Sequence, residues 1–122
     1  LPNAAKRRRK IIMLQGEIWY ANLSPTKGSE RSGLRPVLII SGNLLNQYLN
    51  IVICCPLTTK IKNYKGDLVL EPNKSNGLKQ TSEILTFHIR SISKERLTKK
   101  VGKISAGEIK ELKKYLNEIL EY

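Results

Sequence analysis

Arg35 is the side chain of this sequence whose position best suits chemistry on a phosphate. It ends a polar loop, directly before Pro36 and the apolar run VLII. A residue that precedes proline is restricted to extended conformations, and proline is tolerated as the first residue of a strand. Arg35 therefore has a defined backbone at the mouth of a loop. Its planar guanidinium can donate two parallel, charge-assisted hydrogen bonds to a phosphate.

Two threonines form the second chemical feature. Thr58 and Thr59 end the run IVICCPLTT, just after Pro56. Proline has no N–H to pair in a central strand, so we expect the ladder to break or bulge there and re-aim the residues that follow. If the strands containing Arg35 and Thr58 pair, the two side chains converge beside the loop of residues 27–33. The alternative is a solvated arginine and a turn threonine.

Other kinds of active site find little support in the composition. The chain has one histidine, His88, and two adjacent cysteines, Cys54 and Cys55. Neighbouring residues of a strand point to opposite faces, so these thiols are a poor disulfide pair, and we expect at least one in the core of a cytoplasmic protein. Neither a Cys/His metal spacing, a phosphate-binding glycine loop nor a hydrolytic triad is present, and no cofactor is expected.

Short strands dominate the expected secondary structure. β-branched and apolar runs between turn signals predict strands at residues 16–23, 36–42, 51–59, 67–71, 82–92 (with a possible kink) and 101–104. A short helix is expected at 43–50 with Asn43 as its cap, and one helical turn at 93–97. Ser105 and Glu108 form a capping box.

A final helix follows this capping box. Its apolar residues recur at helical spacing and predict a core-facing stripe, namely Ile109, Leu112, Leu116, Ile119 and Leu120. Several short strands and one closing helix indicate the α+β class, a small, strongly curved sheet or barrel with a C-terminal α-helix.

The charge favours a polyanionic partner. The 122 residues carry 22 Lys and Arg against 10 Asp and Glu, a net charge of +12. Five of these cations lie in residues 6–10, so the rest of the chain carries +7. Residues 1–12 are expected to be a disordered basic tail or vector-derived, ahead of one domain at 13–122. No apolar run approaches the roughly 18 residues of a membrane span.

Several separated blocks together resemble one known family. The blocks are GEIW at 16–19, SPT at 24–26, GSE at 28–30, RPVLI at 35–39, PLTT at 56–59 and IRSISKERL at 89–97. In this combination they resemble the MazF/PemK family, the toxin halves of bacterial toxin–antitoxin pairs. The resemblance extends from about residue 13 to the C-terminus, and the capped final helix also fits it.

The resemblance implies an SH3-like (CcdB/PemK-like) barrel that forms a homodimer in the bacterial cytoplasm. It implies a metal-independent endoribonuclease that cuts single-stranded RNA, chiefly mRNA, and leaves 2′,3′-cyclic phosphate and 5′-OH ends. Arg35 and Thr58 fall on the two catalytic positions of the family. Arg35 would stabilise charge and donate a proton to the leaving oxygen, and Thr58 would hold a phosphate oxygen or the attacking hydroxyl.

The resemblance also names substrate-binding residues and a protein partner. Ser29, Glu30, Arg31 and Thr59 are the candidates for gripping the RNA. The partner implied is an antitoxin whose acidic, partly disordered tail blocks the RNA groove.

The match is incomplete at two positions, and two other functions stay open. Phe87 and His88 replace an acidic residue and a glutamine of the family. Phe87 is therefore expected to stack on a base and His88 to make a polar contact. The rival functions are a gyrase-poisoning toxin of the same fold and a non-catalytic nucleic-acid-binding barrel.

Overall fold

The fold is an antiparallel sheet with a C-terminal helix, seen in a computed structural model that describes residues 12–24 and 33–121. The strands are β1 (Glu17–Asn22), β2 (Leu34–Ile39), β3 (Ile51–Thr58), β4 (Leu68–Leu70), β5 (Ser82–Ile84), β6 (Arg90–Ser93) and β7 (Leu97–Lys103). The helices are α3 (Asn43–Tyr48) and α4 (Ala106–Leu120), with single 3₁₀ turns η2 (Thr86–His88) and η3 (Lys94–Arg96).

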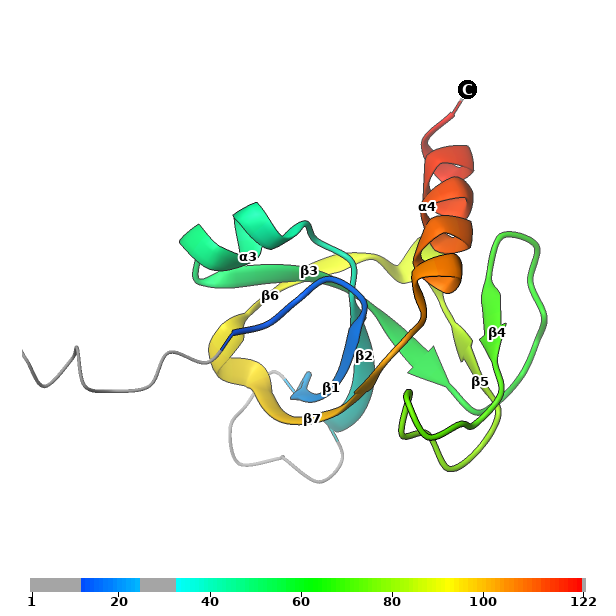
Figure 1. The fold of residues 1–122 in the computed structure, drawn as a ribbon, viewed down its shortest axis with the longest axis horizontal. Helices are drawn as coiled ribbons and strands as arrows, with labels where there is room; N and C mark the ends of the chain where they lie inside the picture. Colours follow the sequence, from blue (N-terminus) through cyan, green and yellow to red (C-terminus); the bar gives the residue numbers. More distant parts are fainter. Residues whose placement is uncertain (1–11, 25–32, 122) are drawn as a thin grey trace, which may run out of the picture.

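The strands follow the order β4-β5-β3-β2-β1-β7 across the sheet, and β6 pairs with β3 off this path. β3 is the strand at which the sheet bends, because Ile51–Cys54 pair with β6 whereas Leu57 and Thr58 pair with β5. The pairing of β3 with β2 ends at Pro56. The predicted break at Pro56 is confirmed, and Figure 1 shows how the sheet curls about this strand. The expected α+β class with a small, curved sheet is likewise confirmed.

Three predicted elements differ from the structure. The last strand, expected at residues 101–104, is the longer β7 (Leu97–Lys103). Residues 82–92 form two strands rather than one kinked strand, because η2 separates β5 from β6 and each pairs with a different part of β3. Asn43 does not cap α3. Gly42 is the N-cap residue, and the side chain of Asn43 instead accepts a hydrogen bond of 2.7 Å from the backbone N–H of Gln15.

Alternation along the central strands divides the core into two clusters, one on each face of the sheet. Trp19, Val37 and Cys54 belong to one cluster, whereas Ile18, Leu38 and Cys55 belong to the other. Neighbouring strand residues point to opposite faces, so both faces of β1, β2 and β3 are covered. The two cysteines are buried and free, as the sequence predicts.

α4 covers the second of these faces. Its capping box is formed, with Ser105 and Glu108 exchanging hydrogen bonds. Leu112 is buried, and Ile109 and Leu116 pack against the same cluster. Ile119 and Leu120 are 41% and 84% exposed, so the predicted core-facing stripe is wrong for the last turn. That turn extends past the sheet, as the red end of α4 in Figure 1 shows.

A turn between β4 and β5 closes the curl by packing against β7. Lys103 N–H donates to the carbonyl of Ser75 over 2.9 Å. Asn76, only 1% exposed, fixes the turn because its side chain accepts from the N–H groups of Asn73 and Leu78. The β4–β5 unit is thereby held against the far edge strand. Among the described residues, no helix is both long and apolar enough to cross a membrane.

Candidate functional site

Arg35 and Thr58 occupy neighbouring strands at the point where the β2–β3 pairing ends. The last pairs are Leu38 with Cys55 and Val37 with Pro56. Arg35 lies two residues before Val37 and pairs with Ala21 of β1, and Thr58 lies two residues after Pro56. Arg35 is exposed and Thr58 is half-buried. Arg35 and Thr58 therefore lie on neighbouring strands, each just beyond the last β2–β3 pair.

Thr58 also belongs to the second half of the sheet. Its partner there is Glu83 of β5, and the next pair is Leu57 with Ile84. The hydroxyl oxygen of Thr58 accepts a hydrogen bond of 3.1 Å from the N–H of Lys60, which orients it at the start of the β3–β4 loop. Thr59 is exposed beside it. Ser29, Glu30 and Arg31 lie outside the described residues.

Phe87 and His88 lie in η2, immediately after β5, and both are exposed. Their rings meet edge to face, with centroids 4.9 Å apart and planes at 68°. Phe87 makes a second such contact with Tyr64, at 5.4 Å and 76°. The backbone N–H of Leu85 donates to the carbonyl of Pro56 over 2.9 Å, so η2 begins next to the bend in β3.

The sequence did not single out Tyr64 or Glu83. Tyr64 lies in a basic connector with no motif around it, and Glu83 is one carboxylate within a strand-like run. The sequence did contain a signal for Glu83. A carboxylate directly before the apolar residues Ile84 and Leu85 of an expected strand is unusual, because ionisable side chains are seldom buried without a partner.

Neither thiol of the chain is poised as a nucleophile. Burial raises the pKa of Cys54 to about 11 and that of Cys55 to about 12, so both thiols are protonated at neutral pH. Within residues 12–24 and 33–121, no three His, Cys, Asp or Glu side chains lie together as a metal site.

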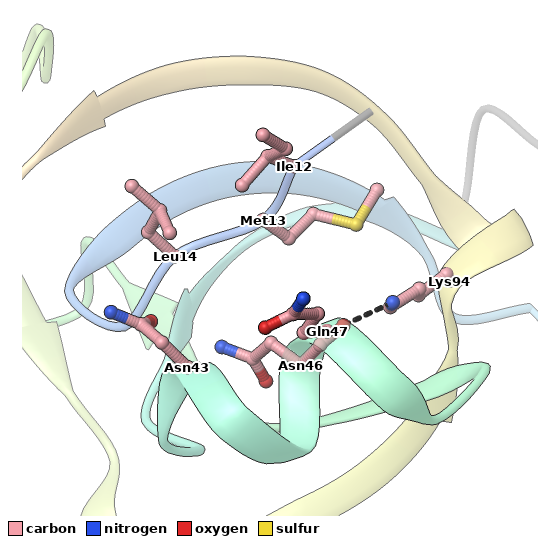
Figure 2. Close-up of a pocket in the computed structure, with 7 residues that line it drawn as sticks. All are labelled: Ile12, Met13, Leu14, Asn43, Asn46, Gln47 and Lys94. Carbon is pink, nitrogen blue, oxygen red and sulfur yellow. Dashed lines mark hydrogen bonds between the residues drawn. The ribbon is translucent and has the colours of Figure 1, made fainter. Parts of the chain in front are cut away.

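A pocket of about 310 Å³ lies elsewhere, between the segment before β1 and α3. Figure 2 shows Met13 above the helix and the Lys94 ammonium directed at the backbone carbonyl of Asn46, to which it donates a hydrogen bond. None of the sequence-predicted site residues lines it. The candidate site is therefore the open surface at the bend of β3 rather than this pocket.

A curled antiparallel sheet closed by a C-terminal helix, with this strand order and bend, is the CcdB/PemK-like fold. Residues 14–120 match the family described as PemK-like, MazF-like toxin of type II toxin-antitoxin system. The chain belongs to this toxin family, in agreement with the resemblance seen in the sequence.

Two curated relatives and one solved structure illustrate the similarity. Endoribonuclease EndoA of Bacillus subtilis (strain 168) is 37% identical over 92 residues, 75% of this chain and 79% of that protein. Endoribonuclease MazF of Staphylococcus saprophyticus is 37% identical over 102 residues, 83% of this chain and 85% of its own. A mycobacterial endoribonuclease in complex with its cognate antitoxin has a TM-score of 0.74 at 20% identity, covering 90% of this chain and 98% of its own. This last match shows the fold.

Proposed function

We propose that this chain is an endoribonuclease toxin that cuts single-stranded RNA at short sequence motifs, with residues 13–122 as the toxin domain. Two relatives that match most of the chain are named endoribonucleases. The observation that supports the proposal is that Arg35 and Thr58 lie on neighbouring strands, each two residues beyond the last β2–β3 pair, Val37 with Pro56, and that Arg35 is exposed. The net charge of +12 suits a polyanionic substrate.

The proposed reaction uses the nucleophile of the RNA itself. The 2′-oxygen bonds to the adjacent phosphorus and loses its proton, while the bond from phosphorus to the 5′-oxygen breaks and that oxygen gains a proton. The products are a 2′,3′-cyclic phosphate and a 5′-OH. Such a reaction asks the protein for orientation, charge stabilisation and proton transfer.

Each proposed residue has one task in this reaction. Arg35 binds the non-bridging oxygens, whose charge grows in the transition state, and assists protonation of the leaving oxygen. Thr58 hydrogen-bonds a phosphate oxygen or the attacking hydroxyl. Ser29, Glu30, Arg31 and Thr59 grip the flanking nucleotides. His88 adds a polar contact, and Phe87 stacks on a base.

The proposed partners follow from the family. A cognate antitoxin would place an acidic and partly disordered tail over the RNA-binding surface. The negative charge of this tail complements the basic body. A mycobacterial endoribonuclease of the same fold is known in complex with its own cognate antitoxin. We place the toxin in the cytoplasm, as a homodimer, where its RNA substrate and antitoxin are made.

The test is cleavage of a long unstructured RNA by pure protein in EDTA, with end mapping. We expect discrete cuts with cyclic phosphate ends, and a loss of about 10²- to 10³-fold in kcat/KM for Arg35→Ala. Arg35→Lys keeps the charge but not the guanidinium fork, so it should recover only part of this loss.

Thr58→Ala in the same assay should also lose most of its activity, whereas its control, Thr81→Ala, should not. Thr81 is a surface threonine whose hydroxyl is bonded to Glu71. Intact RNA with a folded wild-type protein would contradict the proposal and favour gyrase poisoning or simple nucleic-acid binding.

A further inference from the structure

A fully buried carboxylate lies beneath the loop that follows Thr58. Glu83 has an exposed fraction of 0%, and its carboxylate accepts hydrogen bonds from three successive backbone N–H groups. These donors are Lys62 and Asn63, each at 2.7 Å, and Tyr64 at 3.0 Å. Asn63 has φ +56, a left-handed conformation that lets the chain wrap around the anion. The β3–β4 loop is thus held by one side chain.

Asp67 likewise holds the segment after β5 through hydrogen bonds. One of its oxygens accepts from the N–H of Thr86 at 3.0 Å and contacts the Thr86 hydroxyl at 2.8 Å, which fixes the first residue of η2. Its other oxygen has no partner among the described donors. Asp67 and Glu83 are hydrogen-bonding neighbours, and their interaction raises the pKa of Asp67 and lowers that of Glu83.

The two anchored segments carry the rings that meet at the surface. Tyr64 belongs to the loop held by Glu83, and Phe87 follows Thr86, which Asp67 holds. Tyr64 is 48% exposed and Phe87 47% exposed, although large rings are usually more buried. The two rings meet edge to face, and about half of each side chain stays exposed in a strongly basic protein.

This pair of rings lies next to the proposed chemistry. Thr58 and Glu83 are directly opposite residues of an antiparallel pair, so their side chains share one face of the sheet. The loop anchored on Glu83 begins at Thr58, whose hydroxyl binds the N–H of Lys60. A base next to a phosphate held at Thr58 is therefore within reach of the rings.

We propose that Tyr64 and Phe87 form a stacking platform for one unpaired base beside the scissile phosphate, and that the buried Glu83 and Asp67 are the positioning residues that hold it. This inference deepens the proposed function and rests on it. Stacking on aromatic rings is the main way in which proteins hold single-stranded bases, and it contributes about 1–3 kcal/mol per base. Tyr64 thus binds substrate, and Glu83 holds the loop that carries Tyr64.

The test compares Tyr64→Leu and Glu83→Gln with wild type in cleavage of the RNA identified by end mapping. Tyr64→Leu keeps an apolar side chain but removes the ring, and Glu83→Gln replaces an anionic acceptor by an amide that cannot accept all three N–H bonds. We expect KM to rise about tenfold in both variants, within the range of one lost base stack, while kcat stays within about threefold.

Quenching of a fluorescent base provides a second measurement. It reports stacking directly, and a residue with a purely structural role would leave it unchanged. The probe is a short 2′-O-methyl RNA of the mapped sequence, which cannot be cut, with 2-aminopurine placed at each position in turn. Wild-type protein should quench the emission at one position, and both variants should lose this quenching at saturating protein.

Glu17→Gln is the matched control for Glu83→Gln. Glu17 is also buried, at 4% exposure, and binds the Trp19 indole at 2.9 Å and Lys100 at 2.9 Å. Its loss should lower stability with KM and quenching unchanged. If Glu83→Gln does not fold, Tyr64→Leu still tests the proposal, because it changes only a surface side chain. Unchanged KM and quenching in Tyr64→Leu would overturn the proposal, whereas a wild-type protein that neither cuts nor binds RNA overturns the proposed function first.

Discussion

At the scale of residues, the buried carboxyl groups of Asp67 and Glu83 interact, and their pKa values shift in opposite directions. Burial and the hydrogen bond to Glu83 raise the pKa of Asp67 above its usual value. Burial also opposes ionisation of Glu83, but the hydrogen bonds from Asp67 and three backbone N–H groups outweigh it and lower its pKa. Of the two carboxyl groups, Asp67 therefore holds a proton more strongly, and when it is protonated it donates to Glu83.

This arrangement predicts a pH dependence of stability that Asp67→Asn removes. Above the ordinary Asp pKa of 3.8 the folded state retains a proton that the unfolded chain has lost, so the free energy of unfolding falls as pH rises through the raised pKa. The asparagine amide donates to Glu83 without titrating. Urea titrations from pH 4 to 8 should show wild type losing stability relative to Asp67→Asn, by at most about 1.4 kcal/mol per pH unit. A constant difference between the two proteins would exclude the raised pKa of Asp67.

The sequence alone identified some of the candidate site residues and missed others, for a physical reason. Arg35 and Thr58 were recognisable because Pro36 and Pro56 restrict the backbone beside them, which is a local effect. The position of Tyr64 depends on Glu83, a contact 19 residues away in sequence. The fold must form before such a contact exists. The loop candidates Ser29, Glu30 and Arg31 remain predictions.

At the scale of elements, closure of the sheet depends on two glycines that let backbones touch. Gly77 has φ +68, and a Cβ built on it would lie 2.1 Å from the carbonyl oxygen of Val101. A Cβ on Gly102 of β7 would lie 2.4 Å from the backbone of Asn76. The turn and the strand meet at this point, where the hydrogen bond from Lys103 to Ser75 also lies. The apolar runs of the sequence indicate which segments form strands, but this closing contact leaves no periodic signal in the sequence.

Gly102→Ala should therefore weaken the closure of the sheet. The clash is with backbone atoms that have no rotamer to adopt, so we expect a loss of about 3 kcal/mol in the free energy of unfolding. Gly107→Ala is the matched control, because the added Cβ in α4 meets only the Ser105 hydroxyl oxygen, at 3.9 Å. That variant should be more stable than wild type by about 0.5 kcal/mol. Urea titrations measure both. Equal stability of the two variants would mean that the turn does not pack on β7.

At the scale of the whole molecule, the main feature is an excess of positive charge. The net charge is +12, and removing the five cations of residues 6–10 leaves +7. Binding of single-stranded RNA by such a surface releases about 0.7 counterions per neutralised phosphate. In the proposed function, charge would set the affinity for RNA and its salt dependence, whereas the rings and hydroxyls near Thr58 would set the position of the cut.

Salt dependence tests whether the folded body or the tail binds the RNA. If the body neutralises roughly three to four phosphates, the Kd for a 2′-O-methyl RNA rises about 20- to 50-fold between about 50 and about 200 mM salt. A variant with serine at residues 6–10 should keep most of this slope, because the body retains +7. Arg35→Gln should reduce the slope of log K against log salt by about 0.7, the value for one phosphate contact. A slope that collapses in the tail variant but not in Arg35→Gln would mean that residues 6–10 bind the RNA and that Arg35 makes no contact with a phosphate.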